Sequence, residues 1–221
     1  MPCHTCLVRD AVFRRVGRPR GARSGVTRER IVTAASGIFG EFGYHATTFQ
    51  AIAERAQLTR PAINHYFPSK KLLYQAALTQ AETLFAHAVD HASTEPTLVG
   101  QLSSVIVSFT QLGEEDRTVA AFAVTAVVDA QRDPVLKSLV GDIQGPPRAF
   151  LAEALTEAIN RGELVSTSGM GELTEMLLAV LWGITFYVSL VGNQAAAAGV
   201  VATLQALLTQ ELWQLRQPAD G

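Results

Sequence analysis

Apolar residues recur at the spacing of an α-helix through most of this chain, and no segment shows the two-residue alternation of a β-strand. The first clear run begins after Thr27, a suitable N-cap, and stops before Gly43, a residue type that favours helix ends. Its apolar members fall at i, i+3, i+4, i+7, i+8 and i+11, and they are Ile31, Ala34, Ala35, Ile38, Phe39 and Phe42. Because these positions share one face, the pattern predicts an all-α fold that opens on an amphipathic helix.

Two short helices are expected next. The apolar face of the first of them consists of Phe49, Ile52, Ala53 and Ala56. Its N-cap is open, since Thr47 with Gln50 would form a capping box and Thr48 would cap alone. After a three-residue turn, Thr59 is placed to cap the other short helix, with Pro61 in its first turn. A bracing helix followed by two short helices and a tight turn predicts a helix-turn-helix.

The fourth helix is expected to start at Lys70, after the cap Ser69, and to run to about His91. The remainder of the chain predicts further helices over residues 97–112, 115–131, 134–144, 146–161, 171–192 and 195–216, separated by glycine- and proline-containing breaks.

Charge is divided unevenly along the chain. Residues 1–80 contain 12 Lys and Arg but only 4 Asp and Glu, a net charge of +8, whereas the remainder carries −10. This asymmetry indicates a polyanionic partner for the basic part, with nucleic acid the first candidate and a membrane surface the second.

The second short helix of a helix-turn-helix enters the DNA major groove. Its outward residues here would be Thr59, Arg60, Asn64 and His65. Arg60 is suited to guanine and Asn64 to adenine. Lys70, at the start of the fourth helix, is suited to clamp a phosphate. The alternative is an ordinary helical bundle whose basic residues are simply solvated.

Two segments, Thr47–Ala56 and Leu58–Lys70, resemble the DNA-binding domain of the TetR/AcrR family of transcriptional regulators. The resemblance covers about residues 25–85 and implies a dimeric regulator, usually a repressor, whose C-terminal domain binds a small effector. It also implies that an operator, a double-stranded DNA site of near-palindromic sequence, is the partner.

The resemblance carries roles to individual positions. It implies a phosphate contact by Thr48, a base contact by Gln50 and a clamp by Lys70. The groove-facing positions of the recognition helix are Arg60, Pro61 and Ala62. The family usually has Tyr where this chain has Asn64, so His65 and Tyr66 are alternative sources of that phosphate contact.

These observations divide the chain into a disordered basic arm (residues 1–24), a DNA-binding domain (25–85, with the helix-turn-helix at about 48–67) and a helical effector-binding and dimerisation domain (86–216). In the arm, Arg18 and Arg20 are either minor-groove contacts or a source of non-specific attraction alone.

No charged residue occurs from Met176 to Gln210. In the family the last two helices of each protomer form an intermolecular four-helix bundle, which implies a homodimer through about residues 171–216. Burial within one protomer is the alternative. The apolar run Met176–Gly192 is at the lower limit for a membrane span, so we expect buried helices and no membrane.

Large apolar side chains in residues 97–190 predict a pocket for an apolar or amphipathic effector, lined by Phe109, Phe122, Trp182 and Phe186 with Tyr187 near them. Isolated hydrogen bonds would come from Thr110, Thr118 and Thr125. Aromatic residues at helical spacing are also typical of an ordinary core.

Neither an enzyme nor a metalloprotein is expected. The chain has no phosphate-binding glycine loop and no G-x-S-x-G nucleophile. The run Cys3-His4-x-Cys6 has no second half, and the pair His87 and His91 has no third ligand, so no metal or cofactor is predicted. With only two cysteines and no secretory signal, we expect a cytoplasmic, nucleoid-associated protein.

Overall fold

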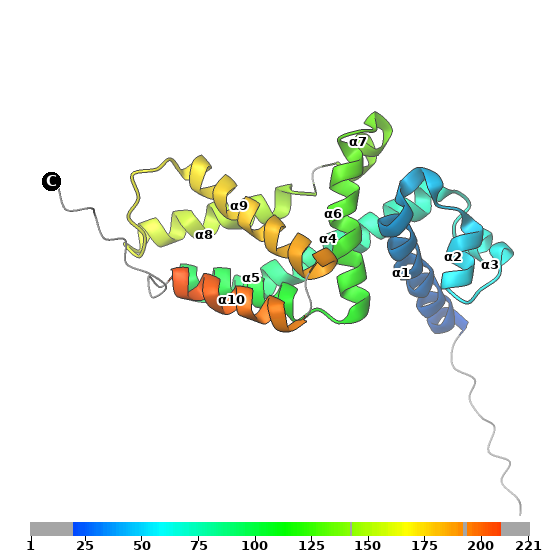
Figure 1. Ribbon diagram of the computed structural model, residues 1–221, viewed down its shortest axis with the longest axis horizontal. Coiled ribbons are helices and arrows are strands. Elements are labelled where there is room, and N and C mark those ends of the chain that lie inside the picture. Colours follow the sequence, from blue (N-terminus) through cyan, green and yellow to red (C-terminus); the bar gives the residue numbers. More distant parts are fainter. Residues whose placement is uncertain (1–19, 142, 192–193, 209–221) are drawn as a thin grey trace, which may run out of the picture.

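The computed structural model describes residues 20–141, 143–191 and 194–208, and every regular element in these ranges is a helix. The prediction of an all-α fold is confirmed. Figure 1 shows an elongated molecule in which residues 20–66 gather at one end and most of the later helices form a bundle. The elements are α1 (Arg20–Ala46), α2 (Phe49–Arg55), α3 (Arg60–Tyr66), α4 (Lys70–Ala92), α5 (Leu98–Thr110), α6 (Glu114–Ala130), α7 (Pro134–Val140), α8 (Gly145–Asn160), α9 (Met170–Phe186), the π-helix η1 (Tyr187–Val191) and α10 (Gln194–Leu208).

Helix α1 begins at Arg20, well before the predicted cap Thr27. The expectation that disorder extends to residue 24 is therefore wrong. Residues in the first turns, such as Val26, are exposed, so this part of the helix has no buried face that an apolar pattern would reveal. The residues Cys3, His4 and Cys6, for which no metal site is predicted, lie outside the described residues together with Arg18 and the side chain of Arg20.

The predicted end of α1 is confirmed at Gly43, where the backbone leaves the helical region at φ 74° and ψ 170° before one last turn. Phe42, however, is 58% exposed and does not belong to the buried face of α1. It lines an open groove between the end of α1 and the turn from α6 to α7, so no helix covers it.

One continuous core joins the basic end of the molecule to the bundle. Helix α1 packs on both α4 and α6, and at this junction Phe39, Tyr44, Tyr74 and Phe122 form an aromatic cluster with ring centroids 4.9–6.0 Å apart. Tyr74, on α4, touches the other three rings. Helix α4 thus contributes to the core of both parts, and the domain boundary near residue 85 stays a prediction.

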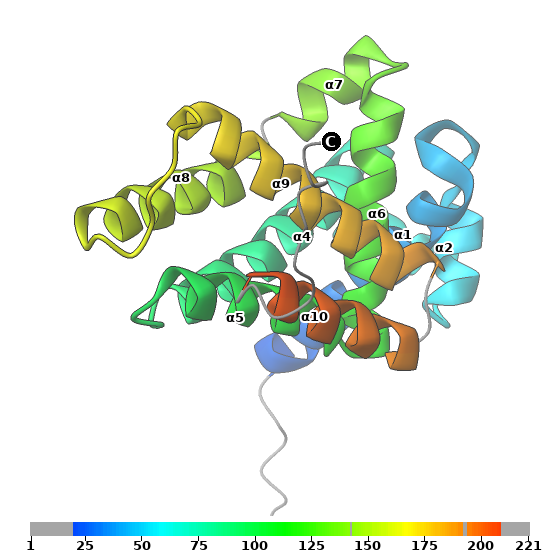
Figure 2. The same cartoon turned by 60° about the vertical axis from the view of Figure 1, so that its left-hand side comes forward.

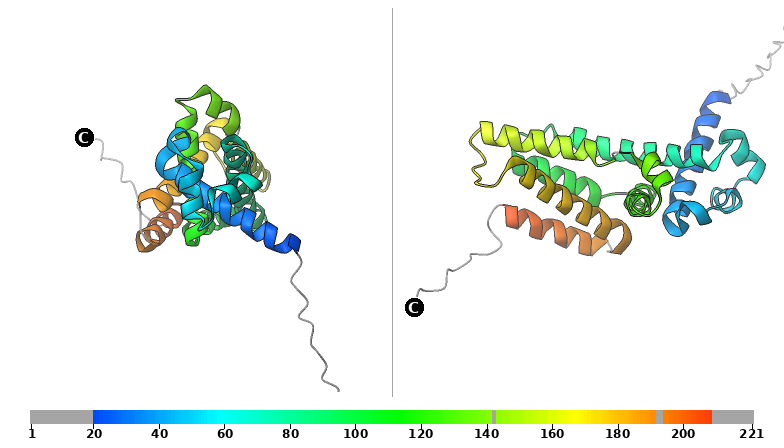
Figure 3. Two further views of the ribbon diagram at one scale, coloured as in Figure 1. Left: turned by 90° about the vertical axis from the view of Figure 1, so that its right-hand side faces the viewer. Right: turned by 90° about the horizontal axis from the view of Figure 1, so that it is seen from above.

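The helices of the bundle agree with the predicted spans to within a few residues, apart from α7, which stops at Val140. Figures 2 and 3 show α10 on the outside of the bundle, alongside α5. Residues 209–216 of the predicted last helix lie outside the described residues.

The segment Met170–Val191 is long and apolar enough to cross a membrane, but in this fold one of its faces packs against other helices. Its inward face packs on α8 and α6, and its buried members include Leu178, Leu181, Ile184 and Val188.

Replacement of Gly43 by alanine tests the turn at the end of α1. The backbone angles of Gly43 lie in a region open almost only to glycine, and an added Cβ would lie 3.2 Å from an Asp129 carboxylate oxygen. We expect Gly43→Ala to lower the free energy of unfolding by about 1–3 kcal/mol, measured by chemical denaturation. The control is Gly25→Ala in α1, where a Cβ meets nothing within 4 Å and stability is expected to hold or rise.

Candidate nucleic-acid interface and effector cavity

The two short helices are capped by threonine hydroxyls. Thr48 Oγ1 accepts from the Ala51 amide at 3.2 Å, and Thr59 Oγ1 accepts from the Ala62 amide at 3.3 Å. These bonds settle the open N-cap in favour of Thr48. The capping box of Thr47 with Gln50 is wrong, because the buried Thr47 hydroxyl instead donates to the Gly43 carbonyl at 2.7 Å.

Apolar contacts fix the orientation of α3. Ile63 has no exposed surface and Phe67 is 4% exposed, and both join the core beneath α2. Since one face is held inside, the other must face solvent. The exposed residues there are Thr59, Arg60, Pro61, Asn64 and His65, while Ala62 and Tyr66 are half-buried. Figure 1 places α2 and α3 at the far end of the molecule from α8.

The two arginines near this surface differ in whether they form an ion pair within the protein. Arg55, at the end of α2, is engaged by Glu41 at 2.9 Å, whereas Arg60 has no ion pair among the described residues. On α2, Thr48 and Gln50 are both exposed, and Gln50 bonds to Glu54 at 2.8 Å. The structure therefore brings the predicted base-reading residues of α2 and α3 to one end of the molecule.

Lys70 makes hydrogen bonds within the protein. Its ammonium donates to the backbone carbonyls of His45 and Thr47 at 3.1 and 3.0 Å, and desolvation lowers its pKa. The side chain turns toward the corner between α1 and α2, and the phosphate clamp expected of Lys70 stays a prediction.

A histidine–carboxylate contact links α1 to α7 beside the aromatic cluster. The Nε2 atom of His45, in the last turn of α1, lies 2.5 Å from a carboxylate oxygen of Asp133, the N-cap of α7. The hydrogen bond from His45, followed by the amide of Val135, lowers the pKa of Asp133. In the cluster itself, burial raises the pKa of Tyr74, whose hydroxyl finds no partner among the described residues and stays neutral.

A small apolar cavity lies among α4, α5, α8 and α9. Its lining is Phe85, Val89, Val105, Phe109, Pro147, Leu178, Leu181, Trp182 and Thr185. The centre of a water molecule has about 20 Å³ available in it, room for little more than one water. No charged group lines it, and its one hydroxyl, on Thr185, donates to the Leu181 carbonyl at 2.9 Å. A ligand larger than water would have to push these helices apart.

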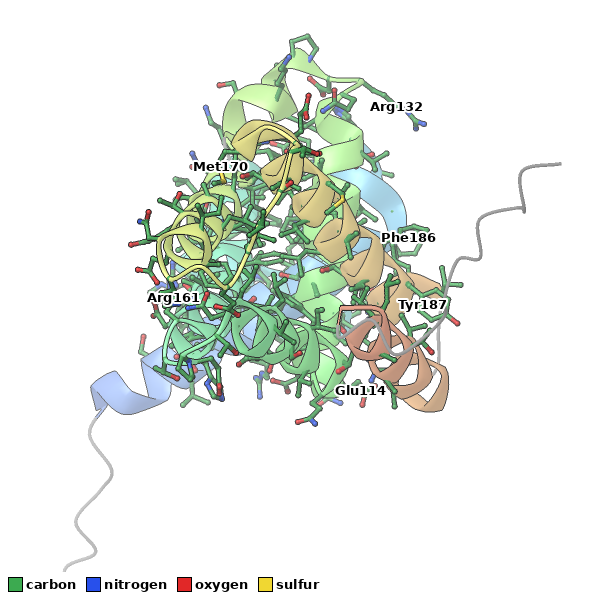
Figure 4. The ribbon with its side chains drawn as sticks, turned by 90° about the vertical axis from the view of Figure 1, so that its left-hand side faces the viewer. Glu114, Arg132, Arg161, Met170, Phe186 and Tyr187 are labelled. Atoms are coloured by element: carbon green, nitrogen blue, oxygen red, sulfur yellow. The ribbon has the colours of Figure 1, made fainter. Side chains whose placement is uncertain are left out.

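Two of the four predicted pocket residues, Phe109 and Trp182, line this cavity. Phe122 does not, because it belongs to the aromatic cluster at the junction, and Phe186 is 48% exposed on the outer side of α9 (Figure 4). Helical spacing shows which side chains share a face but not which neighbouring helix they meet. The contribution of α4 was missed, although Phe85 and Val89 stand four residues apart in the sequence.

Apolar side chains also lie exposed near the end of the bundle. Those on α9 and η1 are Met176, Phe186, Leu190 and Val191, between 45% and 61% exposed, and on α10 they include Val200 and Leu207. Exposed apolar surface of this kind marks an interaction site. It lies within residues 171–216, the predicted dimer contact.

Metal ligands do not assemble in the described part of the chain, where no three His, Cys, Asp or Glu side chains lie close enough to hold an ion. His87 and His91 are both exposed on α4.

Residues 31–77 match the family model described as bacterial regulatory proteins, tetR family. The regulator UidR of Escherichia coli K12 is 24% identical over 186 residues, which cover 83% of this chain and 93% of that protein. Residues 31–77 are thus a DNA-binding domain of the TetR-family type, and the protein is similar over most of its length to a transcriptional regulator rather than to an enzyme.

Other relatives extend the comparison. RutR of Escherichia coli K12 is 42% identical over 53 residues, 24% of this chain and 25% of that protein. FadR of Bacillus subtilis, solved in complex with stearoyl-CoA, is 19% identical with a TM-score of 0.65, over 83% of this chain and 98% of that one. This likeness shows that the two proteins share a fold that extends through the C-terminal helices.

Replacement of Arg60 tests the exposed face of α3. If this guanidinium reads a base, Arg60→Ala will reduce discrimination between operator and random DNA by roughly 1–3 kcal/mol, measured by titration of both duplexes. Lys137→Ala removes one exposed charge from α7 and serves as the control. Equal discrimination by the two variants would remove Arg60 from the base-reading set.

Proposed function

We propose that this TetR-family protein is a cytoplasmic, nucleoid-associated homodimeric repressor that releases a near-palindromic operator when a small apolar or amphipathic effector binds. The observation that carries the proposal is the orientation of α3. Ile63 and Phe67 hold it to the core, while Arg60, Asn64 and His65 face solvent on the basic part of the chain.

In the proposed complex, α3 lies in the major groove and its N-terminal residues meet the base edges. Arg60 and Asn64 are the base-reading candidates, helped by Gln50 from α2. The phosphate contacts come from Thr48, Thr59, His65 and Tyr66, and Pro61 and Ala62 face the groove. Two copies of α3 on a dimer would then meet half-sites about one helical turn apart.

Footprinting on the DNA that flanks the gene tests this function directly. We expect protection of a two-fold symmetric site and lower transcription from the adjacent promoter when the protein is present. Protection without symmetry would contradict the dimeric mode, and activation of transcription would contradict the repressor role.

The exposed apolar residues of α9, η1 and α10 support dimerisation through residues 171–216. A second copy seated on this surface would remove it from water, at roughly 25 cal/mol for each Å² of apolar area buried. Family members act as dimers, and the direction of this surface is away from the recognition helix.

Leu190→Glu is the test of the dimer contact. Leu190 is 45% exposed on η1, and a carboxylate buried between two copies is strongly unfavourable. We expect the variant to be monomeric by light scattering and to lose operator affinity. Val165→Glu, at a 92% exposed residue in the loop before α9, is expected to remain dimeric. A dimeric Leu190→Glu variant would place the contact elsewhere.

The effector is proposed to enter the apolar cavity. Its uncharged lining favours an apolar body, and the likeness in fold to FadR, solved with stearoyl-CoA, supports a long amphipathic ligand. Because the cavity has room for little more than one water, binding of a larger ligand must separate α4 from α5 or α9. Helix α4 runs from Phe85 and Val89 in the cavity to Lys70 beside the helix-turn-helix. A displacement of α4 by the effector would therefore move the helix-turn-helix. Release requires only that the effector bind the DNA-incompetent arrangement more tightly.

Trp182 provides a direct readout of effector entry. With the other tryptophan, Trp213, replaced by phenylalanine, we expect long-chain acyl thioesters or comparable amphiphiles to change Trp182 emission and to release the operator over the same concentration range. The variant Val105→Ile, which adds one methylene group to the cavity lining, should bind operator normally and require more effector for release. Release of this variant at unchanged effector concentration would move the effector site elsewhere.

A further inference from the structure

Helix α4 begins with two adjacent lysines, Lys70 and Lys71, whose side chains lie in different environments. Lys70 lies in phase with Tyr74, Ala77 and Ala81, at i, i+4, i+7 and i+11, and those three residues are at most 1% exposed. Its side chain is therefore directed to the inner face of α4. Lys71, one position further on, is exposed.

The ammonium of Lys70 is held by the protein. It has three N–H donors. Two of them donate to the carbonyls of His45 and Thr47, and the nitrogen also lies over the ring of Tyr44, 4.7 Å from its centroid. A phosphate that left these contacts in place would find only the third N–H.

The two carbonyls belong to the corner that positions α2. A helix leaves its last carbonyls without intrahelical partners, and α1 ends at Ala46. The Thr47 hydroxyl donates to the Gly43 carbonyl, and the Lys70 ammonium donates to the backbone carbonyls of His45 and Thr47. The Thr47 carbonyl belongs to the peptide that joins it to Thr48, the N-cap of α2. Lys70 therefore fixes the peptide from which α2 starts.

Lys71 has the opposite character. No hydrogen bond or ion pair engages it within the described residues, and it stands in the first turn of α4. That turn begins three residues after Phe67, the C-cap of α3, so the start of α4 lies at the same end of the molecule as the recognition helix (Figure 1).

We propose that the two lysines have separate roles: Lys70 is a positioning residue that holds the corner between α1 and α2, and Lys71 supplies the positive charge that meets the DNA backbone at the start of α4. This inference rests on the proposed operator binding. It adds Lys71 as a phosphate-binding residue. Lys70 instead holds α2 in the position from which Thr48 and Gln50 reach the DNA.

The first experiment compares Lys70→Met and Lys71→Met with the wild type, on a duplex that the wild-type protein selects from a random-sequence pool and on a scrambled duplex. Affinity is measured across a salt series below the melting temperature of each variant, and melting temperature is measured separately. Each substitution removes one charge from the same turn, so each is the control for the other.

For Lys71→Met, the slope of log affinity against log salt should become shallower by about 0.9 for each phosphate that the protein no longer neutralises, or about 1.8 for a dimer, with the melting temperature unchanged. For Lys70→Met, the slope should hold while the melting temperature falls by on the order of 5 °C. Its preference for the selected duplex over the scrambled one should fall on the order of 10-fold, because the corner no longer holds α2 in place.

A shallower slope for Lys70→Met at unchanged melting temperature, or an unchanged slope for Lys71→Met, would overturn the proposal. Amine labelling of the unmodified protein, read by mass spectrometry, covers the case in which Lys70→Met does not fold. Lys71 should react in the free protein and be protected by the selected duplex, whereas Lys70 should be protected in both states. A Lys70 that reacts freely until DNA is added would overturn its positioning role.

Failure of the proposed function is distinguishable from failure of this inference. If the wild-type protein selects no duplex, the operator proposal fails. The melting temperature of Lys70→Met and the labelling of the free protein then still decide whether Lys70 braces the corner.

Discussion

The packing of Tyr74 between α1 and α6 is the contact on which the arrangement of this molecule depends. Its ring meets Phe39 and Tyr44 from the basic end and Phe122 from the bundle, with centroids 4.9–5.3 Å apart. Aromatic pairs in this geometry contribute about 0.5–1.5 kcal/mol each beyond the burial of their area. Because the four rings pack against one another, α4 contacts both α1, next to the helix-turn-helix, and the helices of the bundle. A movement of α4 or α6 in the bundle would therefore displace the side chains that pack on α1.

Burial also explains where the molecule remains incomplete. The core accounts for the inner faces of α4, α5, α6, α8 and α9, but leaves apolar side chains exposed on α9, η1 and α10 and a small apolar cavity between α4 and α9. The first feature suits a second protein surface and the second suits an apolar ligand. Both lie away from the recognition helix, so the three proposed binding events use separate surfaces and communicate through the helices between them.

Local rules predicted the helix-turn-helix closely. The caps Thr59 and Ser69, the stop at Gly43 and the inward positions of Ile52 and Ile63 all follow from hydrogen bonding, backbone freedom and periodicity over a few residues. The errors have a common physical origin. The early start of α1, the exposure of Phe42 and the positions of Phe122 and Phe186 depend on which helix packs opposite each face, and no short segment of sequence contains that information.

The sequence by itself determined the all-α class, the helix-turn-helix and the family, because caps, turns and the 3.6-residue period act over single elements. Only the tertiary structure decided which side chains meet. It turned Lys70 inward to the carbonyls of His45 and Thr47, left Lys71 at the surface, and assigned Phe122 to the junction while Phe109 and Trp182 line the cavity. The reason is that burial and hydrogen bonding between helices are properties of their mutual placement, which is set by the whole core at once.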